Sequence, residues 1–267
     1  MRATPTIIAC LFAFLIISGC DIQYRILYHP DGSVPSEASL SAAGIKSWPG
    51  AYQDYRGFIG ANRQAFTKGT IVVFHGNAGT ADDRIFYIRT LGALGYRVIL
   101  AEYPRYGGRT GELGEQAFVD DARETVRLAF SRYGGPIFLL GESLGSGVAA
   151  AAAQDAPVPL DGIVLITPWD TLESVALSKF PFLPVRWLLK DTYDSVDNLK
   201  AFEGRIAVVG AARDSLIPIE HAENLYASLP TTAKRMWTIQ QAGHNDWPRY
   251  ADMQWWRDVM GFLSNSN

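Results

Sequence analysis

The chain has 267 residues, of which 48% are hydrophobic and 19% are charged. This composition excludes an intrinsically disordered protein, because such chains lack the apolar surface needed to offset the entropy lost on ordering. With 24 basic and 27 acidic side chains and a net charge of −3, the chain has no cationic surplus for nucleic acid, and we expect no such partner.

The N-terminus carries an apolar run suited to export. Residues 7–17 are uninterruptedly apolar and follow Arg2. The run is too short to span a bilayer as a helix, but it matches the hydrophobic core of a secretory signal. The sequence Ser18-Gly19-Cys20 that follows resembles the bacterial lipoprotein signal, in which the peptide is removed before a cysteine that then carries acyl chains. Ordinary cleavage near a chance cysteine is the alternative.

Lipidation at Cys20 would remove residues 1–19 and tether the mature chain to a bacterial membrane, on its periplasmic side. Acyl chains at one residue anchor firmly, because each buried CH₂ contributes about 0.8 kcal/mol. Asp21 resembles the enterobacterial signal for retention at the inner membrane, which favours that membrane. Cys10 and Cys20 are the only two cysteines, too few for a disulfide framework or a zinc site, and we predict no metal.

An α/β domain is expected after a connecting segment. Residues 20–47 are polar and rich in turn formers, so we interpret them as a linker to a domain over 48–267. There, short apolar runs alternate with segments of helical periodicity, which indicates βαβ units and a mostly parallel sheet with helices on both faces. The predicted strands are 70–75, 97–103, 136–141, 162–167, 205–210 and 236–239, and the predicted helices are 81–94, 115–133, 144–154, 219–229 and 249–263.

The interval 168–202 interrupts this alternation. It is longer than a simple connection between two strands and is rich in aromatic residues and prolines. Long insertions in compact domains are often lids or binding loops, so we expect a short cap over a site. A surface helix that packs its apolar face on the core is an equally good interpretation.

A Gly-x-Ser-x-Gly motif joins the strand 136–141 to the helix 144–154. Such a turn is so tight that Gly141 and Gly145 must lack side chains, while Ser143 is thrust out at the edge of the sheet. Glycine-rich turns also bind phosphates, but no Gly-Lys-Ser/Thr follows and the dinucleotide fingerprint is absent. The motif therefore predicts Ser143 as a nucleophile.

A serine hydroxyl is a weak nucleophile at neutral pH, so Ser143 needs a general base and the base needs an orienting acid. His244 follows the last predicted strand, where a loop can carry its imidazole over the C-terminal edge of the sheet. Asp214 follows the strand 205–210. The chain order Ser143, Asp214, His244 is that of the α/β-hydrolase triad and differs from the order in the two other well-known triad folds.

Each of these assignments has an alternative. Asp214 could only cap the following helix, and Asp170, after the strand 162–167, is a rival acid. We expect Asp246 to be a local loop partner of the base. His29 and His221 are most simply solvated.

The tetrahedral intermediate of acyl transfer needs preorganised donors for its oxyanion. The turn His75-Gly76-Asn77-Ala78-Gly79 follows the first predicted strand and suits this task. We expect the two donors to be the backbone N–H groups of Asn77 and Leu144. His75 itself is predicted to hold this loop rather than act as a second base.

These motifs together resemble the α/β-hydrolase superfamily, and within it the serine-aminopeptidase-like (S33-type) branch that includes membrane-tethered esterases and depalmitoylase-like proteins. The resemblance covers about residues 24–262. It implies the α/β-hydrolase fold and attack by Ser143 on an acyl carbonyl, with His244 as base, Asp214 as orienting acid and water releasing the acyl group. It implies no metal or organic cofactor. The matching motifs are 72–79, 102–107, 141–145, 214–218 and 243–246.

Two departures bear on the substrate. Residues 105–110 replace the Gly-Tyr-Gly-x-Ser usual in relatives, so the loop beside the pocket is expected to differ. The insertion also lacks the extended cap of dedicated proline aminopeptidases. We therefore expect a lipid-anchored serine hydrolase for acyl esters or thioesters, with lipid-like acyl substrates. The alternatives are a peptidase or amidase, and a lipoprotein that uses the same fold only for binding.

Overall fold

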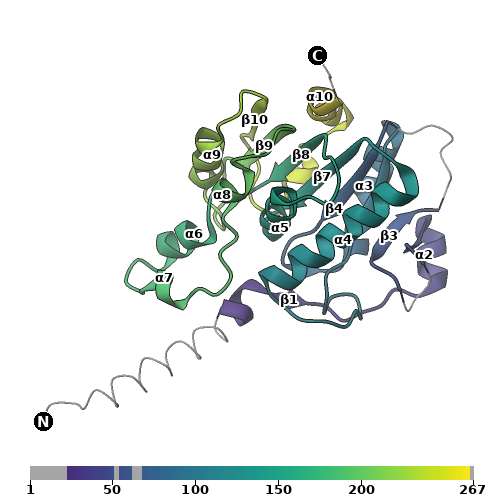
Figure 1. Ribbon diagram of the computed structural model, residues 1–267, viewed down its shortest axis with the longest axis horizontal. Coiled ribbons are helices and arrows are strands. Elements are labelled where there is room, and N and C mark those ends of the chain that lie inside the picture. The colour runs from purple at the N-terminus through teal and green to yellow at the C-terminus, as the bar shows by residue number, and fades with distance from the viewer. Residues whose placement is uncertain (1–22, 51–53, 62–67, 265–267) are drawn as a thin grey trace, which may run out of the picture.

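The computed structural model describes residues 23–50, 54–61 and 68–264 (Figure 1). The predicted signal segment and Cys20 lie outside these ranges. Among the described residues, no helix is both long and apolar enough to cross a bilayer.

An eight-stranded sheet forms the centre of the domain, in the order β10-β9-β8-β7-β4-β6-β3-β2. The six strands from β10 to β6 run parallel, and β3 is antiparallel to both of its neighbours. A separate parallel pair joins β1 (His29–Pro30) to β5 (Ala78–Gly79). The strands of the main sheet are β2 (Ile45–Trp48), β3 (Gly57–Gly60), β4 (Thr70–Phe74), β6 (Arg97–Ala101), β7 (Ile137–Glu142), β8 (Gly162–Ile166), β9 (Arg205–Ala211) and β10 (Lys234–Ile239).

Helices cover both faces of the sheet, as expected for mostly parallel strands that are buried on each side. One face packs against α4 and α5, which lie in front of the sheet in Figure 1, together with α8 and α9. The other face packs against α2, α3 and α10. The bounds are α2 (Glu37–Ala43), α3 (Ile85–Ala93), α4 (Glu115–Tyr133), α5 (Leu144–Gln154), α8 (Ser195–Leu199), α9 (Ile219–Ser228) and α10 (Met253–Ser264).

The predicted α/β-hydrolase architecture is confirmed. All six predicted strands are present, and the predicted helices at 115–133 and 144–154 have those bounds. The predicted helix at 81–94 begins with a 3₁₀ turn, Ala81–Arg84, before α3. The structure adds the strands β2 and β3, which were not predicted.

The interpretation of residues 20–47 as a linker is wrong for the described part, 23–47. Tyr28, Leu40 and Ile45 are buried. The helix α2 starts at the N-cap Ser36, whose side chain accepts a hydrogen bond from Ser39 N, and ends at Gly44, whose φ of 72° favours glycine. The segment is polar because only one side of it faces the core.

The insertion 168–202 contains α6 (Leu172–Lys179), α7 (Val185–Leu188) and α8. Its two ends pack on the domain, where Trp169 and Tyr193 are buried. Its middle extends away from the sheet around α7, at the lower left of Figure 1. The predicted packing of an apolar face on the core therefore describes the ends of the insertion but not its tip.

Candidate active site

The turn from β7 into α5 holds Ser143 in a strained conformation, with φ 52° and ψ −116°. Two glycines make this turn possible. A Cβ on Gly145 would lie 2.1 Å from Phe74 O, and one on Gly141 would lie 2.2 Å from Gly145 O. A non-glycine residue with positive φ is costly and persists only where the surroundings impose it. Here the strain directs the Ser143 hydroxyl out of the sheet.

The structure brings Ser143, His244 and Asp214 together from three loops. His244 Nε2 lies 2.9 Å from Ser143 Oγ, and His244 Nδ1 lies 2.6 Å from Asp214 Oδ2. A carboxylate can only accept, so Nδ1–H donates to Asp214, which leaves the Nε2 lone pair to accept from the Ser143 hydroxyl. The Asp214 side chain is only 1% exposed, which shields this contact from water.

The second carboxylate oxygen of Asp214 is also held by hydrogen bonds. Its Oδ1 accepts hydrogen bonds from Leu216 N and Ile217 N, each at 2.8 Å. The alternative predicted for this residue, a cap on the following helix, is wrong, because the N-cap of α9 is Pro218, without a side-chain cap, and Asp214 binds two backbone N–H groups that precede it. On the histidine loop, Asp246 Oδ1 accepts from Gly243 N at 2.6 Å, which is the local role expected of Asp246.

The turn after β4 lies beside Ser143. Asn77 and Gly76 line the same pocket as Ser143 and His244. The Asn77 carbonyl accepts from His29 N at 3.0 Å and from Tyr106 Oη at 2.7 Å, which fixes the Asn77–Ala78 peptide. The Gly76 carbonyl accepts from His75 Nδ1 at 2.7 Å, which fixes the peptide that carries the Asn77 N–H. Among the described residues, the backbone N–H groups of Asn77 and Leu144 donate to no protein acceptor. Both are available to an anionic oxygen.

A buried histidine–glutamate pair holds the turn after β4 in place. His75 Nε2 lies 2.9 Å from Glu102 Oε1, and both side chains are at most 1% exposed. The other ring nitrogen donates to Gly76 O at 2.7 Å, and Glu102 Oε2 accepts from Ala81 N at 2.9 Å. His75 therefore holds the loop, as predicted, and does not face the pocket. Sequence reasoning missed Glu102 as its partner, because nothing in the local pattern links the two strand ends.

Ser143 opens into a cavity of about 390 Å³. This volume lies within the range of about 300–1,000 Å³ typical of small-molecule sites. The insertion contributes no residue to its wall. The lining residues are Gly76, Asn77, Ala78, Asp83, Arg84, Phe86, Glu142, Ser143, Thr167, Leu216, His244, Asn245, Trp247 and Pro248.

Charged groups on one side of this cavity neutralise one another. Arg84 Nε donates to Glu142 Oε2 at 3.0 Å, and Tyr87 Oη donates to the same carboxylate. Burial acts to lower the pKa of Arg84, but the Glu142 charge and hydrogen bond outweigh it and raise that pKa. Burial, then Glu142, raises the pKa of Tyr87 well above its ordinary value. Arg84 is therefore a permanent cation in the cavity wall, and the buried Tyr87 remains a donor to Glu142.

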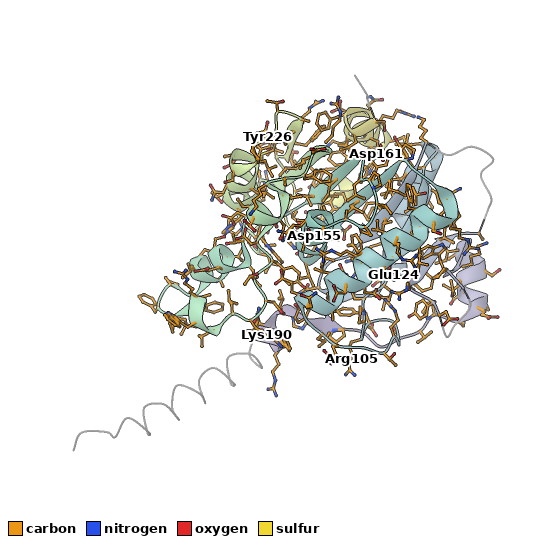
Figure 2. All side chains as sticks on the ribbon, in the orientation of Figure 1. Arg105, Glu124, Asp155, Asp161, Lys190 and Tyr226 are labelled. Atoms are coloured by element: carbon orange, nitrogen blue, oxygen red, sulfur yellow. The ribbon has the colours of Figure 1, made fainter. Side chains whose placement is uncertain are left out.

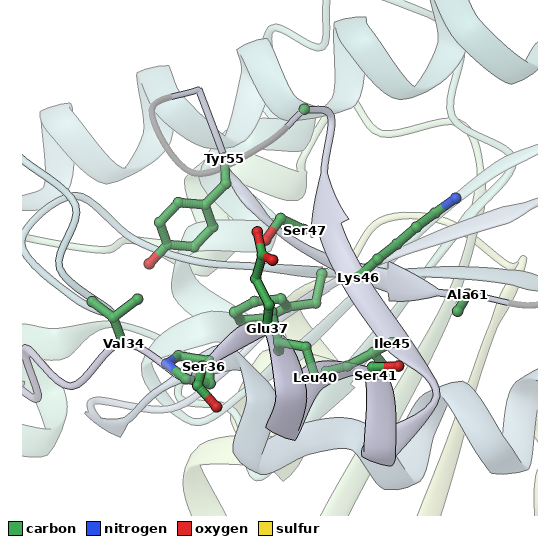
Figure 3. A pocket seen from close by; sticks show the side chains of 13 residues that line it. Val34, Ser36, Glu37, Leu40, Ser41, Ile45, Lys46, Ser47, Tyr55 and Ala61 are labelled. Atoms are coloured by element: carbon green, nitrogen blue, oxygen red, sulfur yellow. The ribbon is translucent and has the colours of Figure 1, made fainter.

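A larger cavity of about 590 Å³ lies elsewhere, between α2 and the edge strand β2 (Figure 3). Val34, Leu40, Tyr55 and Phe58 contribute to its mainly apolar wall, with Glu37 and Lys46 also present. It shares no residue with the Ser143 cavity. It holds no nucleophile–base pair, and the chemistry therefore belongs to the smaller cavity.

A second cluster of serine, histidine and aspartate lies outside the pocket. His221 Nδ1 is 2.9 Å from Asp170 Oδ1 and 3.2 Å from Ser174 Oγ. His221 is only 7% exposed, so the expectation that it is solvated is wrong. It is buried because α9 packs its first turn against the start of α6. Asp170, the rival acid, binds this histidine and not His244.

Within the described part of the chain, no group of three or more His, Cys, Asp or Glu side chains is placed to hold a metal ion. The charged residues Glu124, Asp155 and Arg105, labelled in Figure 2, lie well apart from one another.

Known proteins similar to this chain include hydrolases. Residues 65–190 match the profile of the family described as serine aminopeptidase, S33. The uncharacterized protein Rv2307c of Mycobacterium tuberculosis is 30% identical over 253 residues, which cover 92% of this chain and 89% of that protein. The lysophosphatidylserine lipase ABHD12 of Xenopus tropicalis is 27% identical over 191 residues, 64% of this chain but only 49% of that lipase.

Solved structures share the fold at lower identity. The esterase Pf2001 of Pyrococcus furiosus superimposes with a TM-score of 0.66 at 16% identity, covering 88% of this chain and 98% of the esterase. The monoacylglycerol lipase of Paleococcus ferrophilus gives 0.58 at 19% identity, covering 75% and 96%. The chain belongs to one family with Rv2307c; it has the α/β-hydrolase fold, and its residues 65–190 match the serine aminopeptidase S33 profile.

Proposed function

We propose that the protein is a membrane-tethered serine hydrolase that cleaves acyl esters or thioesters. The observation that carries this proposal is the position of His244, which contacts Ser143 Oγ through one ring nitrogen and Asp214 through the other. This is the arrangement that activates a serine toward a carbonyl carbon. It stands at the mouth of a cavity of suitable size, beside two available backbone donors.

The geometry supports a two-stage reaction. His244 Nε2 takes the Ser143 proton as Oγ bonds to the acyl carbon, and the carbonyl oxygen becomes an oxyanion next to Asn77 N–H and Leu144 N–H. His244 then gives the proton to the departing alcohol or thiol, which leaves an acyl group on Ser143. Water, deprotonated by His244, releases the acid. Asp214 holds the reactive tautomer and stabilises the imidazolium.

The substrate class follows from the relatives and the site. The relatives include a lysophosphatidylserine lipase and the fold neighbours include a monoacylglycerol lipase and an esterase. All three names denote cleavage of an acyl ester. We therefore assign an acyl ester or thioester with a lipid-like acyl chain as the substrate.

The tether is proposed from the sequence. The apolar run 7–17 followed by Ser18-Gly19-Cys20 supports lipidation of Cys20 at the periplasmic side of a bacterial membrane. Asp21 favours the inner membrane. Mass spectrometry of the N-terminal peptide tests this part, with a diacylated Cys20 as the expected first residue and an unmodified cysteine as the contradicting result.

A fluorescent phosphonate that reacts with activated serines tests the nucleophile without a guess at the substrate. We expect the parent to be labelled, Ser143→Ala to be unlabelled and the matched control Ser174→Ala to be labelled like the parent. A folded parent that takes no label, or a Ser143→Ala variant that still does, would overturn the proposal.

Amide cleavage is a second candidate, because the matching family profile is that of a serine aminopeptidase. It requires the same residues and differs only in the leaving group. Rates on an aminoacyl anilide and on the matched aminoacyl ester separate the two. Faster turnover of the anilide, after correction for the uncatalysed rates, would favour the peptidase.

A further inference from the structure

The tip of the insertion exposes a dense group of apolar side chains. Phe182 is 97% exposed and Trp187 is 69% exposed, and Leu177, Phe180 and Leu183 are between 42% and 50% exposed. We call these five residues the insertion patch. The described residues contain nine exposed large apolar side chains, and five of them are in this patch. Single exposed apolar residues are ordinary, but a cluster on one projection marks an interaction surface.

The same stretch is cationic. Lys179, Arg186 and Lys190 are exposed, and residues 174–190 contain no aspartate or glutamate. Apolar side chains interspersed with lysine and arginine suit the boundary of an anionic bilayer, where the rings enter the acyl region and the cations meet lipid phosphates. The overall charge of the chain is negative, so this local surplus of cations distinguishes the tip from the rest of the molecule.

The N-terminal segment enters the domain beside this patch. Gln23 Nε2 donates to Asp191 O at 2.9 Å, and Lys190 N donates to Gln23 Oε1 at 2.7 Å. Tyr28 Oη donates to Asp191 Oδ2 at 2.6 Å. Lys190, labelled in Figure 2, lies at the base of the insertion. Cys20 is three residues before Gln23, a span of at most about 10 Å, so a lipid there would hold the membrane close to this side of the domain.

The patch is also connected to the mouth of the Ser143 cavity. Lys179 Nζ, at the end of α6, donates to Ser215 O at 2.8 Å. The next residue, Leu216, is 52% exposed and lines the cavity. The end of α6, between Leu177 and Phe180 of the patch, therefore contacts the loop that carries Asp214.

We propose that the insertion patch inserts into the surface of an anionic phospholipid bilayer, with Phe182 and Trp187 in the acyl region and the three cations at the headgroups. This inference rests on the proposed function, to which it adds the face that the domain presents to the membrane. The insertion then serves as a membrane contact that sets the cavity mouth near the bilayer, where lipid-like esters are found.

A protein partner is the weaker fit for this tip. Specific protein interfaces bury about 800 Å² on each partner and have a mixed polar rim. The patch lies on one short projection, and all the charged side chains between residues 174 and 190 are cationic, so it lacks a rim of mixed charge. The bilayer needs only a few inserted rings held in place by the adjacent tether.

Tryptophan fluorescence offers a direct test, because Trp187 is exposed while the other six tryptophans are buried or half-buried. The full-length protein, processed by a bacterial host, is bound to vesicles of phosphatidylethanolamine and phosphatidylglycerol whose acyl chains carry bromine, a contact quencher. We expect strong quenching in the parent and in Trp255→Phe, and loss of most of it in Trp187→Phe. Absence of quenching in the vesicle-bound parent, or its persistence in Trp187→Phe, would overturn the inference.

Chemical cross-linking on the same vesicles tests the competing occupant. Cross-linked pairs of chains that disappear in Phe182→Asp would assign the patch to a second copy and overturn the proposal. Chains that stay unlinked while Trp187 is quenched would support it.

Hydrolysis measurements separate the docking from the chemistry. Phe182→Asp should lower the hydrolysis of a vesicle-embedded acyl ester about ten- to a hundredfold, as expected for the loss of one buried ring, and leave the hydrolysis of a water-soluble short ester unchanged. The control Gln254→Asp makes the same charge change on α10, which lies at the top of Figure 1 and away from α7, and should affect neither rate. Equal rates for both variants on the vesicle ester would contradict the docking. A parent that cleaves neither ester contradicts the proposed function instead, and Trp187 quenching still decides the docking.

Discussion

The domain contains two clusters of the same three residue types, and they differ in how the histidine is used. In the pocket, His244 contacts Asp214 through Nδ1 and Ser143 through Nε2. The acid and the serine are therefore on opposite sides of the ring. A proton taken at one nitrogen is matched by a stabilising charge at the other, which is what general base catalysis at a serine requires.

In the second cluster, Asp170 and Ser174 meet the same nitrogen of His221, at 2.9 and 3.2 Å. Ser174 also donates to Asp170 directly. The serine proton is thus already held by a carboxylate, and Ser174 contacts the ring only at the nitrogen that Asp170 also contacts. The three residue types are therefore insufficient for catalysis: the two ring nitrogens must contact different partners, and the serine must face a cavity.

The histidines give the sharpest contrast. His244→Ala should lower kcat on a soluble acyl ester by about 10⁴–10⁶-fold, because the serine loses its base. His221→Ala should retain most of the parent rate, because that ring lies outside the pocket. Steady-state kinetics on purified variants of matched fold, checked by circular dichroism, measure both. A His221→Ala variant as inactive as His244→Ala would remove the distinction between the clusters.

The acids give the next contrast. Asp214→Asn should lower kcat by about 10⁴-fold, because an amide can hold the wrong tautomer of His244 and cannot stabilise the imidazolium. Asp170→Asn should leave kcat near the parent value. If Asp170→Asn had the larger kinetic effect, the rival acid would be the functional one in spite of the 2.6 Å contact that Asp214 makes.

The features that could be predicted from the sequence are those that local chemistry dictates. The turn at Ser143 was predictable because only glycine fits at Gly141 and Gly145, where a Cβ would meet backbone atoms at 2.1–2.2 Å. The helix α4 was predictable because its apolar residues recur at helical spacing over five turns. His244 and Asp214 followed from their places after successive strands, since the C-terminal ends of parallel strands meet at one edge of a sheet.

The features that were missed depend on distant partners. His221 is buried by Asp170, which lies 51 residues earlier, and no local pattern shows this. The strand β3 is short and begins and ends in glycine, so its strand character comes from pairing with β2 and β6. The insertion tip was expected to face either core or substrate, but Phe182 faces neither.

The second cluster should contribute to the stability of the fold, although it does not contribute to catalysis. Asp170 accepts hydrogen bonds from Thr171 N and Ser174 Oγ and lies against His221 with its side chain 14% exposed. Asp170→Asn should lower the free energy of unfolding by about 1–3 kcal/mol, because it leaves buried polar groups unpaired. Urea denaturation followed by fluorescence measures this change.

The matched control for that measurement is Asp197→Asn. Asp197 pairs with Lys200 on the surface, and exposed pairs contribute at most about 1 kcal/mol. Equal effects of the two substitutions would mean that the second cluster is no more than a surface contact.

The C-terminal end of the insertion contacts the N-terminal segment through Tyr28, which lies against Asp191 and Tyr193. This contact predicts that the protein loses stability at alkaline pH. Burial, and then the charges of Tyr193 and Asp191, raise the pKa of Tyr28 above its ordinary value. Above about pH 10, where an exposed tyrosine loses its proton, the folded chain still binds a proton that the unfolded chain has released. The free energy of unfolding is therefore undiminished below that pH and falls as the pH rises above it.

Tyr28→Phe should reduce the slope of the unfolding free energy against pH by up to about 1.4 kcal/mol per pH unit. Tyr250→Phe, an exposed control, should keep the parent slope. Urea denaturation at a series of alkaline pH values measures the slopes, and identical slopes in Tyr28→Phe and the parent would show that this hydroxyl does not hold the N-terminal segment to the insertion.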